Sequence, residues 1–296
     1  MNIIKPKKMK VGDTIGIIAP AGCVDNEVEA LKAKIFFESL GYNIIFGKNI
    51  FNKNRYLAGT DEEKLEDMHA FFADDNINAI FCLRGGYGCV RLINKIDYDL
   101  VKKNPKIFAG YSDITALCLM FFKKSGLITY HAPMFVSDFG ADKISDYTIS
   151  HFLDVITDSG VNKIKAKNIY NNGSAEGILF GGNLATLTSL CGVNFIPDEK
   201  FILFVEELNE PVYKIDRMFN QLLNIEYFRK NLSGIILGDF LKTDNKIWLS
   251  DLFNELKHDL KVPILGGFNI THKKKKLTVP VGEKALINND VVTFYY

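Results

Sequence analysis

In the first half of the chain, short apolar runs alternate with longer segments in which apolar residues recur every three or four positions. Runs of the first kind are typical of buried strands, and segments of the second kind are typical of helices. We expect strands near residues 13–20, 42–46, 78–83, 106–111 and 127–130. Strands that alternate with helices in this way favour a mostly parallel sheet flanked by helices, in a Rossmann-like or flavodoxin-like arrangement.

The second half shows a denser pattern of short strands and turns. We expect strands near residues 177–180, 201–205, 234–238, 262–265 and 291–294, and helices near residues 215–223 and 250–260. The segment between the halves is more polar and contains turn-forming stretches. The pattern therefore predicts an N-terminal α/β domain of residues 1–142, a connector of residues 143–174 and a smaller mixed α/β domain of residues 175–296.

The length and charge of the chain narrow the class of protein. At 296 residues the chain exceeds the usual span of one hydrophobic core, which agrees with two domains. Lys and Arg number 36 against 35 Asp and Glu, so the formal charge is +1. Because this balance gives no field of one sign, we expect a small substrate rather than nucleic acid or an anionic membrane.

The sequence also bears on location and cofactors. No apolar run approaches the roughly 20 residues that a membrane span needs, and the first residues lack the apolar stretch of a signal peptide. We therefore expect a cytoplasmic protein. The five cysteines show none of the paired spacings of a zinc site, and we expect them to be reduced packing residues, with no metal or cofactor.

Ser112 occupies a position at which such folds display a nucleophile. Residues 107–115 form a short apolar run that ends in a small residue and a serine, directly ahead of a helical pattern. A serine at a sharp strand-to-helix turn projects its hydroxyl beyond the carboxyl ends of the strands, where ligands of parallel sheets bind. The position also suits a helix cap, since Ser112 or Asp113 can cap the helix that follows. Position alone leaves both interpretations open.

A glycine-rich loop at residues 84–88 follows a predicted strand. Its spacing matches neither the dinucleotide-binding fingerprint nor the P-loop, and no Lys-Ser or Lys-Thr pair follows it. Glycine is the default residue of tight turns, so a plain turn is one interpretation. The other is that the loop lies beside Ser112 and donates a backbone N–H to a developing oxyanion.

Several separated segments, taken in order, resemble one protein family. They are residues 12–22, 84–88 with Arg91 and Leu92, 110–115, 130–134 and 181–184. Together they are similar to the LD-carboxypeptidases of the serine peptidase class, which include murein tetrapeptide carboxypeptidases and microcin-C immunity peptidases. The resemblance extends over nearly the whole chain.

The resemblance implies a Ser-Glu-His triad in which Ser112 is the nucleophile. It marks Glu206, the first carboxylate after the strand near residues 201–205, as the acidic member. From the residues alone, Glu207 and Glu210 have similar claims. A serine hydroxyl is a poor nucleophile at neutral pH, so a base must take its proton during attack.

The same resemblance marks His272 as this base, because it stands eight residues before Pro280, as in the family. Without the resemblance, His131 has an equal claim, since it follows a strand in the same half as Ser112. A site built in this way lies in the cleft between the two domains.

Further site residues are expected around this triad. We expect the backbone N–H groups of Gly86 and Asp113 to form the oxyanion hole. Recognition of a terminal carboxylate needs a cation, and Arg84 and Arg217 are the two candidates.

One segment departs from the family pattern. Relatives commonly have glycine on each side of the catalytic histidine, whereas this chain has Thr271 and Lys273, followed by three more lysines. We interpret the run of residues 273–276 as a solvated surface turn, because exposed charges contribute little individually. The alternative is that the run attracts substrates that bear carboxylates.

The resemblance implies a cytoplasmic serine carboxypeptidase that releases a terminal D-amino acid, expected to be D-alanine, from murein tetrapeptides in cell-wall recycling. It also suggests a homodimer. The first alternative is an immunity-type amidase that acts on peptidyl nucleotides. The alternative of another class is a non-catalytic nucleotide or sugar binding protein that uses the glycine loop.

Overall fold

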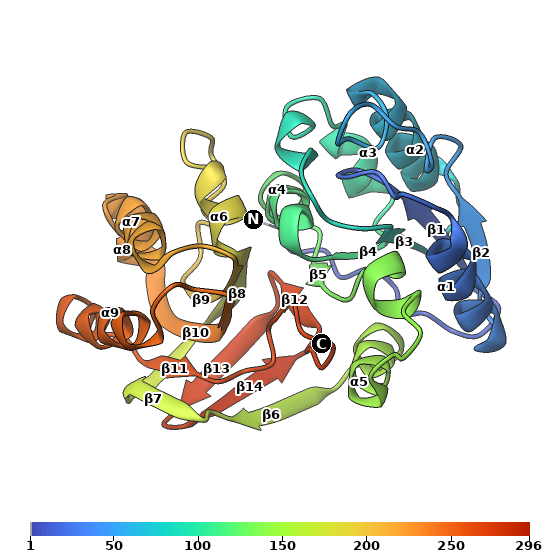
Figure 1. Ribbon diagram of the computed structural model, residues 1–296. Coiled ribbons are helices and arrows are strands. Elements are labelled where there is room, and N and C mark those ends of the chain that lie inside the picture. The colour runs from blue at the N-terminus through green and yellow to red at the C-terminus, as the bar shows by residue number, and fades with distance from the viewer. Residues whose placement is uncertain (1) are drawn as a thin grey trace.

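The computed structural model describes residues 2–296, which form two sheets with helices packed on them (Figure 1). The first sheet has six strands in the order β12-β5-β4-β3-β1-β2. These strands are β1 (Thr14–Ile18), β2 (Asn43–Phe46), β3 (Ala79–Cys82), β4 (Ile107–Gly110), β5 (Thr129–His131) and β12 (Val279–Val281). Strands β2, β1, β3, β4 and β5 pair in parallel, and β12 pairs antiparallel to β5.

Helices cover both faces of the first sheet. They are α1 (Val28–Ser39), α2 (Asp61–Ala73), α3 (Tyr98–Lys103), α4 (Thr115–Ser125) and α5 (Asp146–Thr157). Phe37 of α1 and Phe152 of α5 pack against Phe81 on one face, whereas Phe72 of α2 packs near Phe108 on the other. The parallel strand order is the flavodoxin-like one, and the expected α/β fold class is confirmed.

The second sheet has eight strands in the order β6-β14-β13-β8-β9-β10-β11-β7. Their bounds are β6 (Val161–Lys165), β7 (Asn168–Asn171), β8 (Ser174–Asn183), β9 (Phe201–Leu208), β10 (Leu232–Leu241), β11 (Ile264–Gly266), β13 (Lys284–Asn288) and β14 (Val291–Tyr295). The central strands β8, β9, β10 and β11 are parallel, and the outer strands are antiparallel to their neighbours.

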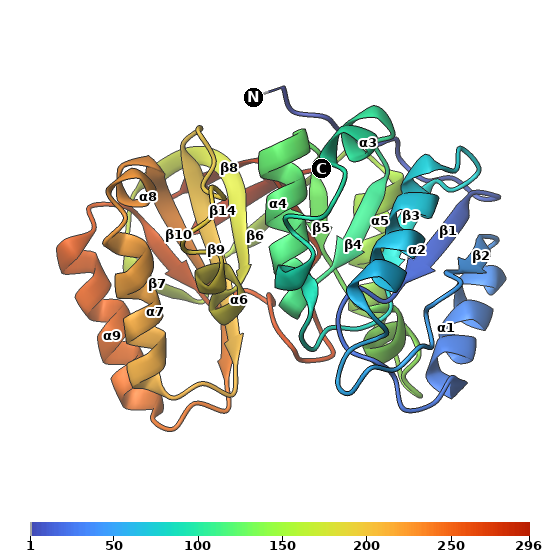
Figure 2. The ribbon, with the colours of Figure 1, turned by 90° about the horizontal axis from the view of Figure 1, so that it is seen from above.

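Four helices follow the central strands of this sheet. They are α6 (Leu184–Ser189), α7 (Val212–Leu223), α8 (Glu226–Asn231) and α9 (Lys246–Asp259). Phe219 of α7 and Phe253 of α9 both pack against Phe240 of β10. Helix α4 lies between the two sheets and contacts β8 as well as its own sheet, so the two halves share a hydrophobic core (Figure 2).

The chain crosses between the sheets more than once. Residues 143–174, which the sequence predicts as a connector, hold α5, which packs on the first sheet, and β6 and β7, which are the edge strands of the second. Strand β12 lies within residues 175–296 and yet completes the first sheet. The domain boundaries themselves stay a prediction, but the segment between β11 and β12 necessarily spans both sheets.

No helix within residues 2–296 is both long enough and apolar enough to cross a membrane.

Candidate active site

Ser112 stands at a strained turn between β4 and α4. Its φ is +59°, in the left-handed region that a side chain other than glycine rarely adopts. A short 3-10 turn (Ser112–Ile114) leads into α4, and the cap of α4 is Ile114, with no side-chain hydrogen bond among the described residues. The structure therefore does not use the Ser112 hydroxyl as the cap of α4, and the turn resembles the one that exposes a nucleophile.

The glycine loop lies directly against this serine. A Cβ added to Gly85 would stand 3.1 Å from the Ser112 Cβ and 3.2 Å from its Oγ, so a larger residue there would crowd the serine. The buried carboxylate of Asp113 accepts a hydrogen bond from the Cys89 N–H at 2.9 Å, and Gly22 N donates to Gly85 O at 3.1 Å. Burial raises the pKa of the Asp113 carboxyl. These contacts fix the backbone of the loop beside the hydroxyl.

Glu206 and His272 form a close pair. Glu206 Oε2 and His272 Nδ1 are 2.7 Å apart, and the Glu206 side chain is fully buried. Glu206 lies near the end of β9, whereas His272 lies in the segment that crosses from β11 to β12. Of the three carboxylates that the sequence left as rivals, Glu206 is the one that contacts this histidine.

The two rival carboxylates have other partners. The side chains of Glu206 and Glu207 leave β9 in opposite directions because successive residues of a strand alternate in direction. Glu207 accepts hydrogen bonds from Asn183 Nδ2 at 3.0 Å and from Ala185 N at 2.7 Å, and so holds the turn between β8 and α6. Glu210 pairs with Lys214 at 3.0 Å, one helical turn further on.

His131 lies beneath the site rather than on its surface. It is buried in β5, with its ring 5.8 Å from Tyr111 and 5.5 Å from Phe204. Burial and, to a smaller extent, the nearby His272 and Lys276 together lower the pKa of His131 to about 3. His131 is therefore neutral at physiological pH and packs below Tyr111.

The expectation of a solvated lysine turn is wrong for Lys276. Its side chain is 3% exposed, its Nζ is 2.6 Å from Asp138 Oδ1, and it lies 4.1 Å above the centre of the Tyr111 ring. The Tyr111 ring in turn packs edge-on against His272, with centres 4.9 Å apart. Burial lowers the pKa of Lys276. Because the backbone N–H of Lys276 also donates to Thr148 Oγ1, this lysine anchors the loop that carries His272.

The other lysines of the run remain nearer to solvent. Lys273 pairs with Asp239 at 3.0 Å, and Lys275 lies 4.5 Å from the centre of the Tyr147 ring. The sequence alone does not predict the anchoring role, because four identical residues in a row give no signal that one of them is buried. A better signal of a buried charge was Asp138, which is the one charged residue in the mostly apolar segment of residues 132–139.

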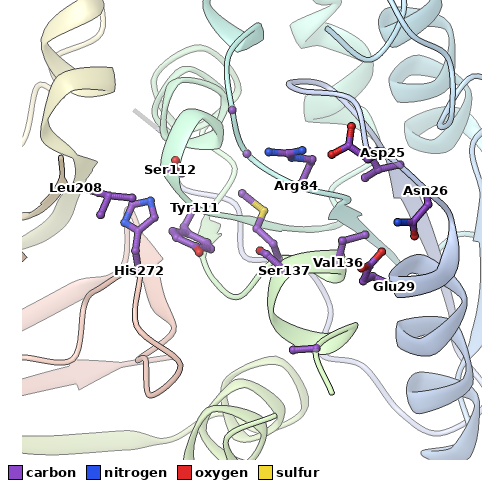
Figure 3. Close-up of a pocket in the computed structure, with 15 residues that line it drawn as sticks. Asp25, Asn26, Glu29, Arg84, Tyr111, Ser112, Val136, Ser137, Leu208 and His272 are labelled. Atoms are coloured by element: carbon purple, nitrogen blue, oxygen red, sulfur yellow. The ribbon is translucent and has the colours of Figure 1, made fainter. Parts of the chain in front are cut away.

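Ser112 and His272 stand where two cavities meet. The first cavity measures about 570 Å³ and the second about 480 Å³. Four residues line both of them, namely Gly86, Ser112, Leu208 and His272. Figure 3 shows the first cavity, with Ser112 and His272 on one side and Asp25, Asn26 and Glu29 on the other. A ligand bound at Ser112 can therefore extend into both cavities.

The two candidate arginines lie in different places. Arg84 lines the first cavity and donates from Nη1 to Cys23 O at 2.8 Å (Figure 3). Arg217 is exposed on α7, with its guanidinium 5.9 Å from the centre of the Tyr213 ring, and it lines neither of the two cavities described here. Arg84 is therefore the cation that the structure places near Ser112.

Residues 15–132 match the family model of the LD-carboxypeptidase N-terminal domain, and residues 176–287 match that of the LD-carboxypeptidase C-terminal domain. The chain belongs to the LD-carboxypeptidase family. This family member is 37% identical to the "Probable murein peptide carboxypeptidase" of Bacillus subtilis (strain 168), over 96% of this chain and 91% of the relative. It is 31% identical to the "Microcin C7 self-immunity protein MccF" of Escherichia coli, over 95% of this chain and 92% of that protein.

The LD-carboxypeptidase fold is also found in solved structures. The crystal structure of an MccF-like protein from Bacillus anthracis superimposes with a TM-score of 0.91 at 28% identity, covering 98% of this chain and 99% of the other. The family resemblance drawn from the sequence motifs is confirmed, and with it the expectation of a carboxypeptidase of the serine peptidase class.

Proposed function

We propose that this LD-carboxypeptidase hydrolyses the L,D-peptide bond that precedes a terminal D-amino acid, and that its substrate is a murein tetrapeptide ending in D-alanine. The observation that carries the proposal is the contact between Glu206 and His272, together with the cavity that His272 and the strained Ser112 both line. The substrate class is supported by the relative named as a probable murein peptide carboxypeptidase.

In the proposed reaction, His272 Nε2 takes the proton of the Ser112 hydroxyl while Oγ attacks the carbonyl carbon of the L-configured residue. Glu206 accepts the hydrogen bond from His272 Nδ1, which fixes the tautomer and stabilises the imidazolium. The C–N bond then breaks, and the imidazolium returns its proton to the leaving amine of the D-amino acid. Water, activated by the same histidine, hydrolyses the acyl-enzyme and regenerates Ser112.

The oxyanion that forms during attack needs preorganised donors. We assign these donors to the backbone N–H groups of Gly86 and Asp113, on the support that the glycine loop is held against Ser112 and that Asp113 follows it in the turn. Arg84 is our candidate for a substrate carboxylate, since its guanidinium lines the first cavity.

Three finer features are part of the proposal. The cytoplasmic location is expected from the pattern of apolar residues in the sequence, whereas a role in cell-wall recycling and a homodimeric state are implied by the family resemblance.

Mass spectrometry of the purified protein incubated with murein tri-, tetra- and pentapeptides tests the substrate. We expect the tetrapeptide to lose the mass of one D-alanine residue, with no effect of a chelator. A tetrapeptide that ends in L-alanine and the Ser112→Ala variant serve as controls, and both should show no release. Activity that a chelator abolishes and zinc restores would contradict the serine mechanism.

The identity of 31% to the microcin C7 self-immunity protein supports a second candidate, a serine amidase that acts on peptidyl nucleotides. An aminoacyl sulfamoyl adenosine in the same assay distinguishes the two activities. Faster hydrolysis of that compound than of the tetrapeptide would favour the amidase. Nucleotide binding without hydrolysis of either compound would favour a non-catalytic binding protein.

A further inference from the structure

A further cavity lies at the opposite end of the first sheet from Ser112. It measures about 540 Å³ and includes Asp13, Asn78 and Lys106, the residues that immediately precede β1, β3 and β4. These are the amino ends of parallel strands, whereas Ser112 follows the carboxyl end of β4. The cavity is therefore separate from the peptidase site.

The lining of this cavity is strongly basic. Six of its residues are lysines, namely Lys5, Lys7, Lys8, Lys10, Lys103 and Lys106. Only two of its residues are acidic, Asp13 and Asp75, so the cavity carries an excess of four positive charges in a chain whose formal charge is +1. Such a concentration of one sign in a concave surface focuses the field and attracts anions.

Two of these lysines are withdrawn from solvent without a carboxylate partner. Lys106 is buried, and its Nζ donates to the carbonyl oxygens of Asp74 at 2.7 Å and Ile77 at 2.5 Å. Lys8 is half-buried and donates to Val155 O at 2.7 Å. Among residues 2–296, neither ammonium has a carboxylate within 4.0 Å. Removing a cation from water without a counter-charge costs free energy, and an anion that approaches the cation lowers this cost.

The remaining groups leave the positive charge uncompensated. Lys5 pairs with Glu283, but the ammonium groups of Lys7, Lys10 and Lys103 have no hydrogen-bond or ion-pair partner within the described part of the chain. The Asp13 carboxylate accepts from the backbone N–H of Lys10 at 2.9 Å rather than from an ammonium. The three exposed ammonium groups of Lys7, Lys10 and Lys103 are thus available to one ligand, while Lys106, which lines the same cavity, adds to its positive charge.

We propose that this cavity binds a compact multivalent phosphate, such as an oligophosphate, at a site independent of the peptidase reaction. Ammonium groups are strong point-charge donors to phosphate oxygens. The volume lies within the range of small-molecule sites, about 300–1,000 Å³. None of the described residues that line the cavity is aromatic, so they offer no surface on which a nucleobase can stack, and the phosphates themselves are the recognised group.

Isothermal titration of the full chain with sodium tripolyphosphate at low ionic strength tests this site. We expect one molecule to bind per chain, with an affinity that falls as salt is added. The triple variant Lys7→Gln, Lys10→Gln, Lys103→Gln should bind at least about tenfold more weakly, because it removes three of the charges that face the ligand. The substituted side chains are exposed, so the fold should be retained, and thermal unfolding verifies this.

A matched control carries the same loss of charge elsewhere. The triple variant Lys102→Gln, Lys124→Gln, Lys261→Gln changes exposed lysines that do not line the cavity, and it should bind tripolyphosphate within about twofold of the unmodified chain. Equal weakening in both triple variants would overturn the site in favour of general charge attraction. Absence of binding at millimolar tripolyphosphate, or citrate binding as tight as that of tripolyphosphate, would overturn the phosphate assignment.

Discussion

The turn that carries Ser112 and the loop that carries His272 are built in different ways. The Ser112 turn depends on residues close in sequence, because β4, the serine at positive φ and α4 follow one another within residues 107–125. The His272 loop depends on distant residues. Glu206 is 66 positions away from His272, and Asp138, which pairs with the Lys276 of the loop, is 138 positions from that lysine.

Because of this difference, substitutions in the two regions should affect activity and stability differently. A substitution of Ser112 alters the reacting group. The contacts that hold the surrounding backbone in place remain. Changes at the contacts of the His272 loop remove buried charge pairs and so affect stability as well as activity. Substitutions on each side should therefore give different ratios of lost activity to lost stability.

The largest effect is expected at the nucleophile. Ser112→Ala should lower kcat/KM for an L,D-peptide by on the order of 10⁴- to 10⁶-fold, because the attacking oxygen is lost. The free energy of unfolding should change little, since Ser112 does not cap α4. Steady-state kinetics and urea unfolding measure the two quantities, and activity within tenfold of the unmodified enzyme would end the serine hypothesis.

Two adjacent carboxylates on β9, Glu206 and Glu207, should respond differently to substitution. Glu206→Gln should cost about 10³- to 10⁴-fold in kcat, because the amide no longer supports the imidazolium or its tautomer. Glu207→Gln should cost less than about tenfold in kcat, but it disturbs the hydrogen bonds to Asn183 and Ala185 and should lower the unfolding free energy by about 1–3 kcal/mol. A reversed order of the two activity losses would contradict the assignment of Glu206.

The buried lysine of the loop should behave unlike its exposed neighbour. Lys276→Met leaves the Asp138 carboxylate buried without its partner and should destabilise the fold by about 3–5 kcal/mol. Lys273→Met removes a more exposed pair with Asp239 and should cost at most about 1 kcal/mol. Chemical denaturation of both variants measures this difference. Equal costs would show that Lys276 does not anchor the loop.

A further effect, which is spread over a range of pH, concerns His131. Its folded pKa of about 3 lies below the ordinary value of 6.5, so the unfolded chain binds the extra proton between these two values. The stability that the neutral His131 contributes is therefore complete above about pH 6.5 and is lost as the pH falls toward 3, by up to about 1.4 kcal/mol per pH unit. NMR titration should show no protonation of the His131 ring between pH 8 and 5. A midpoint near pH 6.5 would contradict its burial as a neutral group.

The sequence predicts those elements that depend on residues close together in the chain. The apolar runs and helical periods predicted the five parallel strands of the first sheet, and the Ser112 turn was visible because strand, serine and helix are contiguous. Strands β6, β7 and β13 were not predicted, since each is at most five residues long and contains at least two polar residues, so that no apolar run in them exceeds three residues. Burial of Lys276 and the return of β12 to the first sheet depend on tertiary contacts that no local pattern records.

The choice among Glu206, Glu207 and Glu210 shows the same limit. Glutamates near the end of one strand have the same chemistry. They differ only in the direction in which their side chains point and in the residues that the rest of the fold places beside them. The family resemblance selected Glu206, and the structure supplies the physical reason, which is the contact with His272.

The central claim is that Ser112 and His272, although built by different parts of the chain, act as one catalytic unit. A double-mutant cycle on L,D-peptide hydrolysis, with Ser112→Ala, His272→Ala and the variant that combines them, tests it most directly. If the two groups act together, each single substitution should cost nearly the same factor in kcat, and the combined variant should be scarcely slower than either. Losses that multiply, with the combined variant slower by the product of the two single factors, would contradict the account.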